Sequence, residues 1–173
     1  FLTKDGETTT EWKAEDQVVC GDAMPECSGT FGINMDYRGI FLNMSFYYQF
    51  GGQTYNQTLV DRVENANVGL NVDKRIYNAV WKKPGDRVDF SYNPYRLTKP
   101  SSRFVQDLNE LRLSSLNVGY DFRHCAFLKK SRLQQLKASF YMDDVFRAST
   151  VKTERGLTYP FARTFSFSLQ ATF

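Results

Sequence analysis

Long apolar runs are absent from this sequence, and so is a large excess of charge of either sign. No stretch approaches the roughly 18 consecutive apolar residues of a transmembrane helix, which argues against a helical membrane protein. The net charge is only +3 and the Lys and Arg residues are scattered, which argues against a nucleic-acid-binding protein. With one histidine and no grouping of nucleophile, base and acid, nothing indicates an enzyme, a metal site or a cofactor.

Large aromatic residues are plentiful instead. The 173 residues include 15 Phe and 10 Tyr, although the mean hydropathy is only -0.47. Many large rings in an otherwise polar chain are typical of strands in which apolar and polar residues alternate. The length is that of one ordinary domain, so we treat residues 1–173 as a single piece.

The final segment, residues 163–173, shows the alternation most clearly. One side of an extended strand would carry the apolar residues Phe165, Phe167, Leu169, Ala171 and Phe173. The other side would carry the polar residues Thr164, Ser166, Ser168, Gln170 and Thr172. A membrane-crossing strand needs roughly 9 to 11 residues with this pattern. The segment therefore predicts a lipid-facing strand of an outer-membrane barrel.

Four earlier segments repeat the pattern, and together with the last they predict about five strands. They are residues 30–37, 40–50, 111–122 and 136–142. The dipeptide Arg38-Gly39 predicts a tight turn that joins the first two into a hairpin. In the third segment, Leu111 and Leu113 are out of phase with the later apolar residues, so we expect a β-bulge near Ser114-Ser115.

The connections between these segments alternate in length. Residues 51–104 and 143–162 are long connections, and the first of them has no sustained period; residues 123–135 are shorter and add a helical turn. Outer-membrane barrels have short periplasmic turns and long extracellular loops, so the long connections are expected outside the cell. Five strands cannot close a barrel that usually needs at least about eight. Because the chain also opens at Phe1 without a signal sequence, we expect it to be a fragment that lacks upstream strands.

The three cysteines leave two interpretations open. Cys20 and Cys27 enclose a short loop that a disulfide would close in an oxidising compartment, or they are unpaired thiols. Cys125 follows His124, but adjacent residues of a strand point to opposite faces, so a catalytic pair is not expected.

The order and spacing of several short motifs resemble one known family. These motifs are Asp16-Gln-Val-Val-Cys-Gly21, Gly29-Thr-Phe-Gly32, Tyr37-Arg-Gly39, Phe46-Tyr-Tyr-Gln-Phe-Gly-Gly52, Tyr55-Asn56, Trp81-Lys-Lys-Pro-Gly-Asp86, Ser102-Arg-Phe-Val-Gln-Asp107, Leu111-Arg-Leu113, Gly119-Tyr120, Tyr159-Pro-Phe-Ala-Arg-Thr-Phe165 and Phe173. From about Asp16 onward the chain resembles the carboxy-terminal part of the SusC/RagA-type TonB-dependent outer-membrane transporters of Bacteroidetes.

The resemblance implies an all-β fold, an antiparallel up-and-down transmembrane β-barrel segment with long extracellular loops. The whole barrel would have about 22 strands and an amino-terminal plug. It implies a place in the cell outer membrane, in contact with lipid, beneath a SusD-like surface lipoprotein. It further implies energy from TonB-ExbB-ExbD, delivered through a missing amino-terminal part, and import of glycan oligosaccharides or, in some members, peptides.

Six aromatic or polar residues are candidates for function within that frame. Trp81, Tyr92 and Tyr95 lie in the long connection, where they either stack on sugar rings or pack the loop or the lid partner. Tyr47 and Gln49 are expected to face the lumen, and Phe173 resembles the terminal aromatic read by the outer-membrane insertion machinery or is a girdle aromatic.

A soluble glycan-binding β-sandwich is the alternative. It would pack the apolar sides of its strands on one another and protect its edges with Lys, Pro or bulges. The final strand contains neither Lys nor Pro, which disfavours this alternative.

Overall fold

The computed structural model describes residues 1–67, 69–91, 97–128, 133–152 and 162–173. These residues form two compact units. The loop unit comprises Phe1–Met24, Gly52–Asp107 and the described residues from Val151. The strand unit comprises Pro25–Gly51, Leu108–Thr150 and the strand that begins at Phe165. Each unit is treated by itself below.

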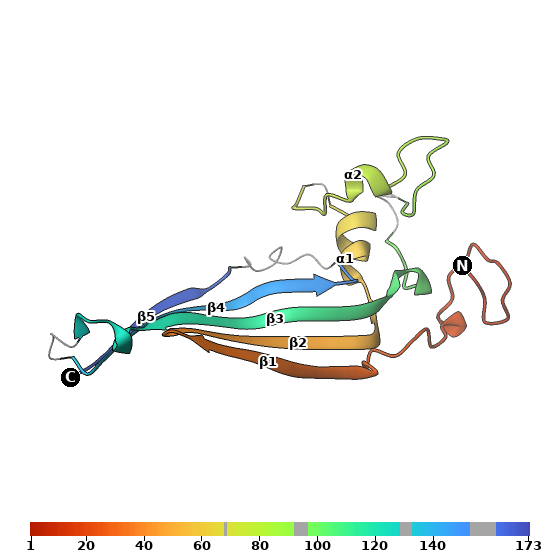
Figure 1. The fold of residues 1–173 in the computed structure, drawn as a ribbon. Helices are drawn as coiled ribbons and strands as arrows, with labels where there is room; N and C mark the ends of the chain where they lie inside the picture. The colour runs from red at the N-terminus through yellow and green to blue at the C-terminus, as the bar shows by residue number, and fades with distance from the viewer. Residues whose placement is uncertain (68, 92–96, 129–132, 153–161) are drawn as a thin grey trace. The chain divides into compact units, whose positions relative to one another are not determined.

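Five strands make one sheet (Figure 1). They are β1 (Cys27–Tyr37), β2 (Ile40–Tyr55), β3 (Val105–Asp121), β4 (Gln135–Ser149) and β5 (Phe165–Thr172). Their order in the sheet is their order in the chain, and the pairing is antiparallel. The predicted up-and-down arrangement of five strands is therefore confirmed, whereas the closure of a barrel and its total strand number stay predictions.

The turn between β1 and β2 has the conformation that the sequence predicts. Both Arg38 (φ 49°) and Gly39 (φ 89°) lie in the left-handed region. Two such residues in succession match the twist of a hairpin. Tyr37 and Ile40 close the turn as register partners, so the predicted hairpin is confirmed.

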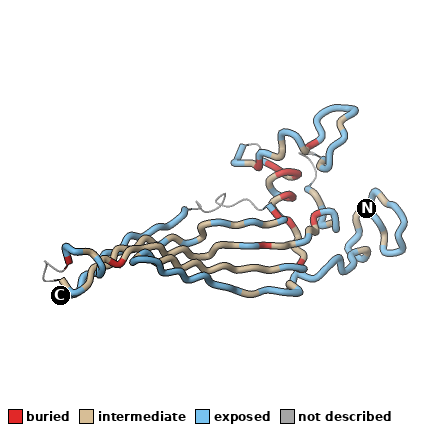
Figure 2. Tube along the Cα trace, in the orientation of Figure 1, coloured by how far each residue is buried: buried red, intermediate tan, exposed pale blue. Residues whose placement is uncertain are grey.

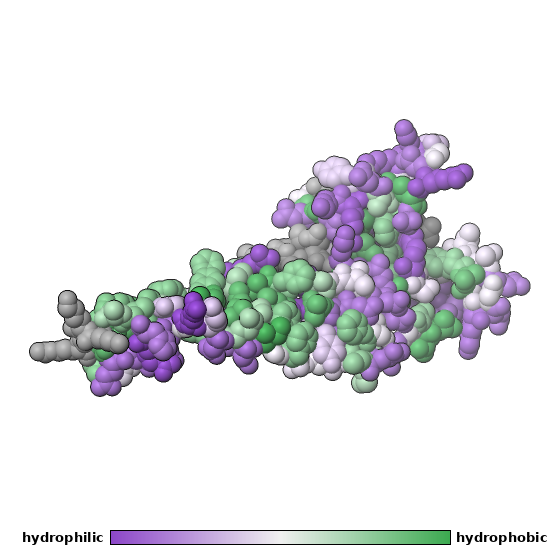
Figure 3. All heavy atoms as spheres, in the orientation of Figure 1, coloured by the Kyte–Doolittle hydropathy of each residue, from purple (hydrophilic) through white to green (hydrophobic). Residues whose placement is uncertain are grey.

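The apolar residues of neighbouring strands lie on the same side of the sheet. Ile33 is paired with Met44, and the rings of Phe31 and Phe46 stack with their centroids 4.8 Å apart. The apolar residues of the outer strands β1 and β5 are exposed, including Phe167 at 73%, whereas most of those on the central strands are half-buried (Figure 2). Apolar side chains are prominent along the strands in the space-filling view (Figure 3). We call this the apolar side. No second sheet covers it among the described residues, which argues against the sandwich.

The predicted bulge is present and keeps the apolar side continuous. Leu113 is paired with Phe146 but Ser115 with Asp143, so Ser114 of β3 faces two residues of β4. One of those two, Asp144, has a left-handed backbone (φ 49°). This mismatch of one residue of β3 against two of β4 breaks the two-residue period at this point of the sheet. Leu111 and Leu113 thereby join the apolar residues of the second half of β3.

The strands are longer than the alternation predicts. β2 continues through Gly51 and Gly52 to Tyr55, because Gly51 takes a left-handed conformation (φ 80°) within the strand. β4 continues past its bulge to Ser149. In both cases an irregular backbone residue interrupts the two-residue period without ending the strand.

The long connection after β2 contains folded structure that the sequence analysis missed. Its helices are α1 (Gln57–Leu59), a π-helical turn (Val60–Glu64), α2 (Ile76–Ala79) and a 3-10 turn (Ser102–Phe104). A small core joins Leu59, Val60, Val63, Val80 and Phe104.

Two further 3-10 turns span Ala14–Asp16 and Phe122–His124, the second of which confirms the helical turn expected after β3. Over the part of the chain that is described, no helix combines the length and the apolar character required to cross a membrane.

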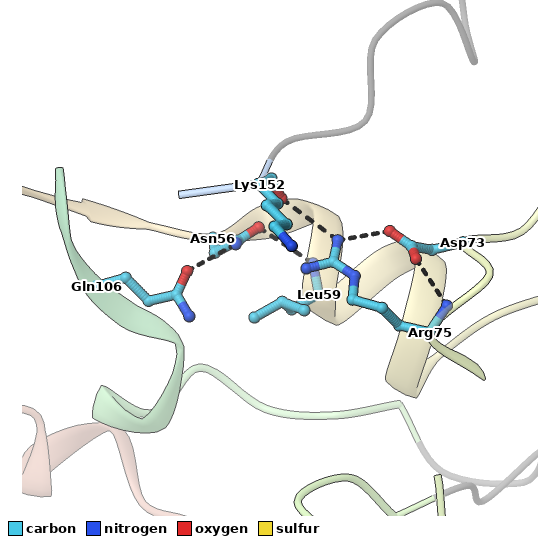
Figure 4. A network of polar contacts seen from close by, with 6 residues as sticks. All are labelled: Asn56, Leu59, Asp73, Arg75, Gln106 and Lys152. Atoms are coloured by element: carbon cyan, nitrogen blue, oxygen red, sulfur yellow. Dashed lines mark hydrogen bonds and ion pairs between the residues drawn. The ribbon is translucent and has the colours of Figure 1, made fainter. Parts of the chain in front are cut away.

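Polar contacts hold this core in place (Figure 4). Asn56, which is 1% exposed, accepts a hydrogen bond from the Leu59 amide at 3.2 Å and donates one to Gln106 Oε1 at 2.8 Å. Arg75 pairs with Asp73 at 2.5 Å and donates to the Lys152 carbonyl oxygen at 3.3 Å. Asn56 therefore caps α1 and ties it to the start of β3.

We expect Asn56→Ala to destabilise the loop unit by about 1–3 kcal/mol, because a helix cap is lost and buried partners lose their hydrogen bonds. Amide hydrogen exchange of residues 57–64 would show the loss as faster exchange. The exposed neighbour Gln57 provides a control, since Gln57→Ala should change exchange little. Equal protection in both variants would contradict this role of Asn56.

Candidate functional site

The polar side of the sheet carries the two candidates Tyr47 and Gln49. Tyr47 Oη donates a hydrogen bond to Gln49 Oε1 at 2.7 Å, which fixes both side chains on β2. The guanidinium of Arg112 lies 5.2 Å from the centroid of the Tyr47 ring. An arginine over an aromatic face is a cation–π contact. The structure places both candidates together on the polar side, and their exposure to a barrel lumen stays a prediction.

Charged residues of β3 and β4 join this polar side, and the sequence analysis did not single them out. The carboxylate of Glu110 binds Arg147 at 2.6 Å, and the Glu110 side chain is only 7% exposed. Arg112 and Arg147 are direct register partners across the two strands. Like charges in this position repel one another. The pattern Leu111-Arg-Leu113 was the available signal, because alternation places the arginine opposite the two leucines.

The loop unit contains a groove of about 1720 Å³. Its walls come from the amino-terminal segment, from residues 97–105, and from Tyr55, Glu64 and Ser91. Trp12 links the amino-terminal segment to residues 97–105, because its indole N–H donates a hydrogen bond to the Pro100 carbonyl oxygen at 3.0 Å. Lys99 Nζ lies 5.6 Å from the centre of the Trp12 ring. Residues far apart in the sequence build this groove, so no local motif could have revealed it.

An ion pair between a buried carboxylate and an exposed guanidinium forms part of the groove wall. Glu64 is 5% exposed and binds Arg103, and Ser91 Oγ donates to Glu64 Oε1 at 3.1 Å. The Arg103 guanidinium lies 4.8 Å from the centroid of the Phe104 ring. The groove thus presents the aromatic residues Trp12 and Tyr55 together with charged groups such as Lys99 and Arg103.

The aromatic candidates of the long connection have different outcomes. Trp81 is 45% exposed and its amide donates to the Phe90 carbonyl oxygen at 2.9 Å, but it does not line the groove. Tyr77, close by in sequence, is also exposed. Tyr92 and Tyr95 lie outside the described residues. Trp81 is thus an exposed ring that a ligand or a partner can reach.

The remaining candidates are Phe173 and the two cysteines. Phe173 follows β5 and is 81% exposed. Cys20 and Cys27 are both free and exposed, and Cys27 is the register partner of Phe50. The structure thus contains no disulfide between them, and a bond in an oxidising compartment stays a prediction. Among the described side chains, no group of three His, Cys, Asp or Glu residues is placed to hold a metal ion.

Comparisons with known proteins show which sequences and structures this chain is similar to. No protein-family model matches the chain. The TonB-dependent receptor P3 of Formosa agariphila is 26% identical over 193 aligned positions, which cover 99% of this chain and 18% of that protein. Solved structures of the RagAB peptide importer superpose with a TM-score of 0.71 in the open-open state and 0.63 in the closed-closed state. Their sequence identities are 18% and 17%, and the matches cover 98% and 87% of this chain.

The chain therefore spans about a fifth of the length of these proteins, 18% of the receptor and 19% of the first RagAB chain. The relatives are a receptor and an importer, which supports the interpretation that the chain is not an enzyme. They also support the expected outer-membrane location. The resemblance that the sequence indicates is confirmed as a similarity: residues 1–173 are similar in sequence to a part of a TonB-dependent receptor and in fold to a part of the RagAB peptide importer.

Proposed function

We propose that this chain is the carboxy-terminal barrel part of a TonB-dependent transporter that imports an oligomeric nutrient. The observation that carries the proposal is the sheet itself, with one exposed apolar side and one polar side. Such a sheet suits a wall between lipid and a polar interior. In this arrangement the loop unit lies outside the cell, and its groove and Trp81 meet the incoming cargo.

The first candidate cargo is a glycan oligosaccharide. Trp81 and Tyr77 present exposed rings, and aromatic faces offer a large apolar area to a partly polar ligand. A peptide is the second candidate, because the matched solved structures are of a peptide importer. The charged groups of the groove, among them Arg103 and Lys99, can bind peptide carboxylates and carbonyl groups.

The proposed partners follow from the same relatives. A SusD-like surface lipoprotein would cover the loops, as the name RagAB indicates an assembly of two components in the matched structures. TonB-ExbB-ExbD would supply energy through a part of the protein outside residues 1–173. Outer-membrane lipid would contact the apolar side of the sheet.

Growth assays test the transport and identify the cargo. Deletion of the whole gene in its native bacterium should abolish growth on one cargo class, supplied as glycan oligosaccharides or as peptides. In the complemented strain, Trp81→Ala should raise the half-saturating cargo concentration by about tenfold, if the ring contributes about 1.5 kcal/mol to binding.

The matched control is Leu70→Ala, an exposed apolar residue of the same unit that has no ring and should leave uptake unchanged. Growth of the deletion strain on both cargo classes at the wild-type rate would contradict the proposed import. An effect of Leu70→Ala equal to that of Trp81→Ala would instead contradict the role of the ring.

A further inference from the structure

Arg112 is a cation on the polar side of the sheet. No salt bridge or hydrogen bond of its side chain is present among the described residues, and its Nε is buried without a hydrogen-bond partner. Its direct partner across the strands is another arginine, Arg147. A buried donor that lacks a partner costs free energy, and so does a like charge placed opposite.

The nearby acids are already engaged. The carboxylate of Glu110 binds Arg147 at 2.6 Å, and Asp143 accepts a hydrogen bond from Tyr141 at 2.6 Å. The carboxylate of Glu110 is thus engaged by Arg147, and Arg112 has no ion pair with it among the described residues. An additional anion would remove both the repulsion and the unmet hydrogen bond.

Arg112 is held in place for such an anion. Its guanidinium lies over the ring of Tyr47, and the hydrogen bond from Tyr47 to Gln49 fixes that ring. A guanidinium is planar and presents its N–H groups as a rigid fork. This fork matches the two oxygens of a carboxylate.

We propose that Arg112, supported by Tyr47 and opposed by Arg147, is the receptor for a carboxylate group on the polar side of the sheet. The carboxylate has two sources. It is carried by a free acidic ligand, or it belongs to an Asp or Glu side chain in the part of the longer protein outside residues 1–173. The proposal is independent of transport and of the cargo class proposed above.

Calorimetric titration of the purified full-length protein with tetraglutamate and with tetraglutamine tests the first source. We expect tetraglutamate to bind about tenfold tighter or more, as one charge-assisted contact implies. Arg112→Gln should remove the preference, and Arg112→Lys should weaken it because the charge remains and the fork is lost. Arg38→Gln is the matched control, since Arg38 also lies 5.2 Å from a tyrosine ring, that of Tyr37.

An electron cryomicroscopy structure of the full-length protein tests the second source. Without a peptide preference, an Asp or Glu carboxylate within hydrogen-bond distance of the Arg112 guanidinium supports the internal source. A preference that survives Arg112→Gln, or is lost equally in Arg38→Gln, overturns the proposal. Absence of both a preference and such a carboxylate overturns it as well. If Arg112→Gln does not fold, Arg112→Lys carries the comparison with Arg38→Gln.

Discussion

Gly119→Ala is expected to prevent correct pairing of β3 with β4. A Cβ at this position would lie 2.4 Å from the carbonyl oxygen of Ala138 and 2.3 Å from Cζ of Phe41. The phenyl ring can rotate away, but the carbonyl belongs to the backbone of the neighbouring strand and cannot move without breaking the register. Overpacking typically costs about 1–3 kcal/mol, and more where the contact is with a backbone atom that cannot move. The full-length protein should lose its heat-modifiable band in gel electrophoresis, the usual sign of a folded barrel.

Two further variants separate the backbone contact from the ring contact. Gly32→Ala on β1 is the matched control, because a Cβ there meets only the Met44 carbonyl oxygen, at an ordinary 3.4 Å. The double variant Phe41→Ala/Gly119→Ala removes the ring but keeps the contact with Ala138, so it should fold poorly as well. Full recovery in the double variant would show that Phe41, and not the strand backbone, limits the space.

Phe167→Arg should reduce the stability of the protein in a bilayer by about 2–4 kcal/mol, the cost of an arginine on the lipid face near the membrane centre. Phe167 is paired with Phe140 on the apolar side and is largely exposed in the structure. In water this substitution would be nearly neutral, because no core contact is lost. Urea unfolding in lipid vesicles measures the difference directly.

Ser168→Arg supplies the comparison for this prediction. Ser168 is the next residue of β5 and points to the polar side, where a charge contacts water. The stability of the Ser168→Arg variant in vesicles should stay close to that of the unaltered protein. Equal stabilities of the Phe167→Arg and Ser168→Arg variants would contradict the assignment of the apolar side to lipid and would favour the soluble sandwich.

Sequence alternation was sufficient to predict the sheet, because the strands carry their apolar residues on one side. The pairs Ile33–Met44 and Phe140–Phe167 lie where a two-residue period places them. The same reasoning located the bulge from the phase of Leu111 and Leu113. It underestimated β2, because a glycine pair usually ends a strand and here Gly51 continues it with a left-handed backbone.

The alternation of apolar and polar residues could not predict the loop unit or the surroundings of Arg112. The core around Val63 and Phe104 brings together residues about forty positions apart, and no period links them. The groove depends on contacts such as that of Trp12 with Pro100, which only the folded chain reveals. The lack of an ion pair at Arg112 among the described residues is likewise visible only in the folded chain. Glu110 is close to Arg112 in the sequence, but in the structure its carboxylate binds Arg147.

The irregular pairing opposite Ser114 has a consequence for how relatives of this protein can diverge. The halves of β3 before and after it carry their apolar residues at odd and at even positions, as Leu113 and Leu116 do. Loss or gain of one residue elsewhere in the strand would turn apolar side chains to the polar side. Between Leu113 and Leu116, the loss or gain of one residue leaves the apolar residues of both halves on the apolar side. This short stretch is therefore where an alignment of homologous strands can accommodate a single-residue gap.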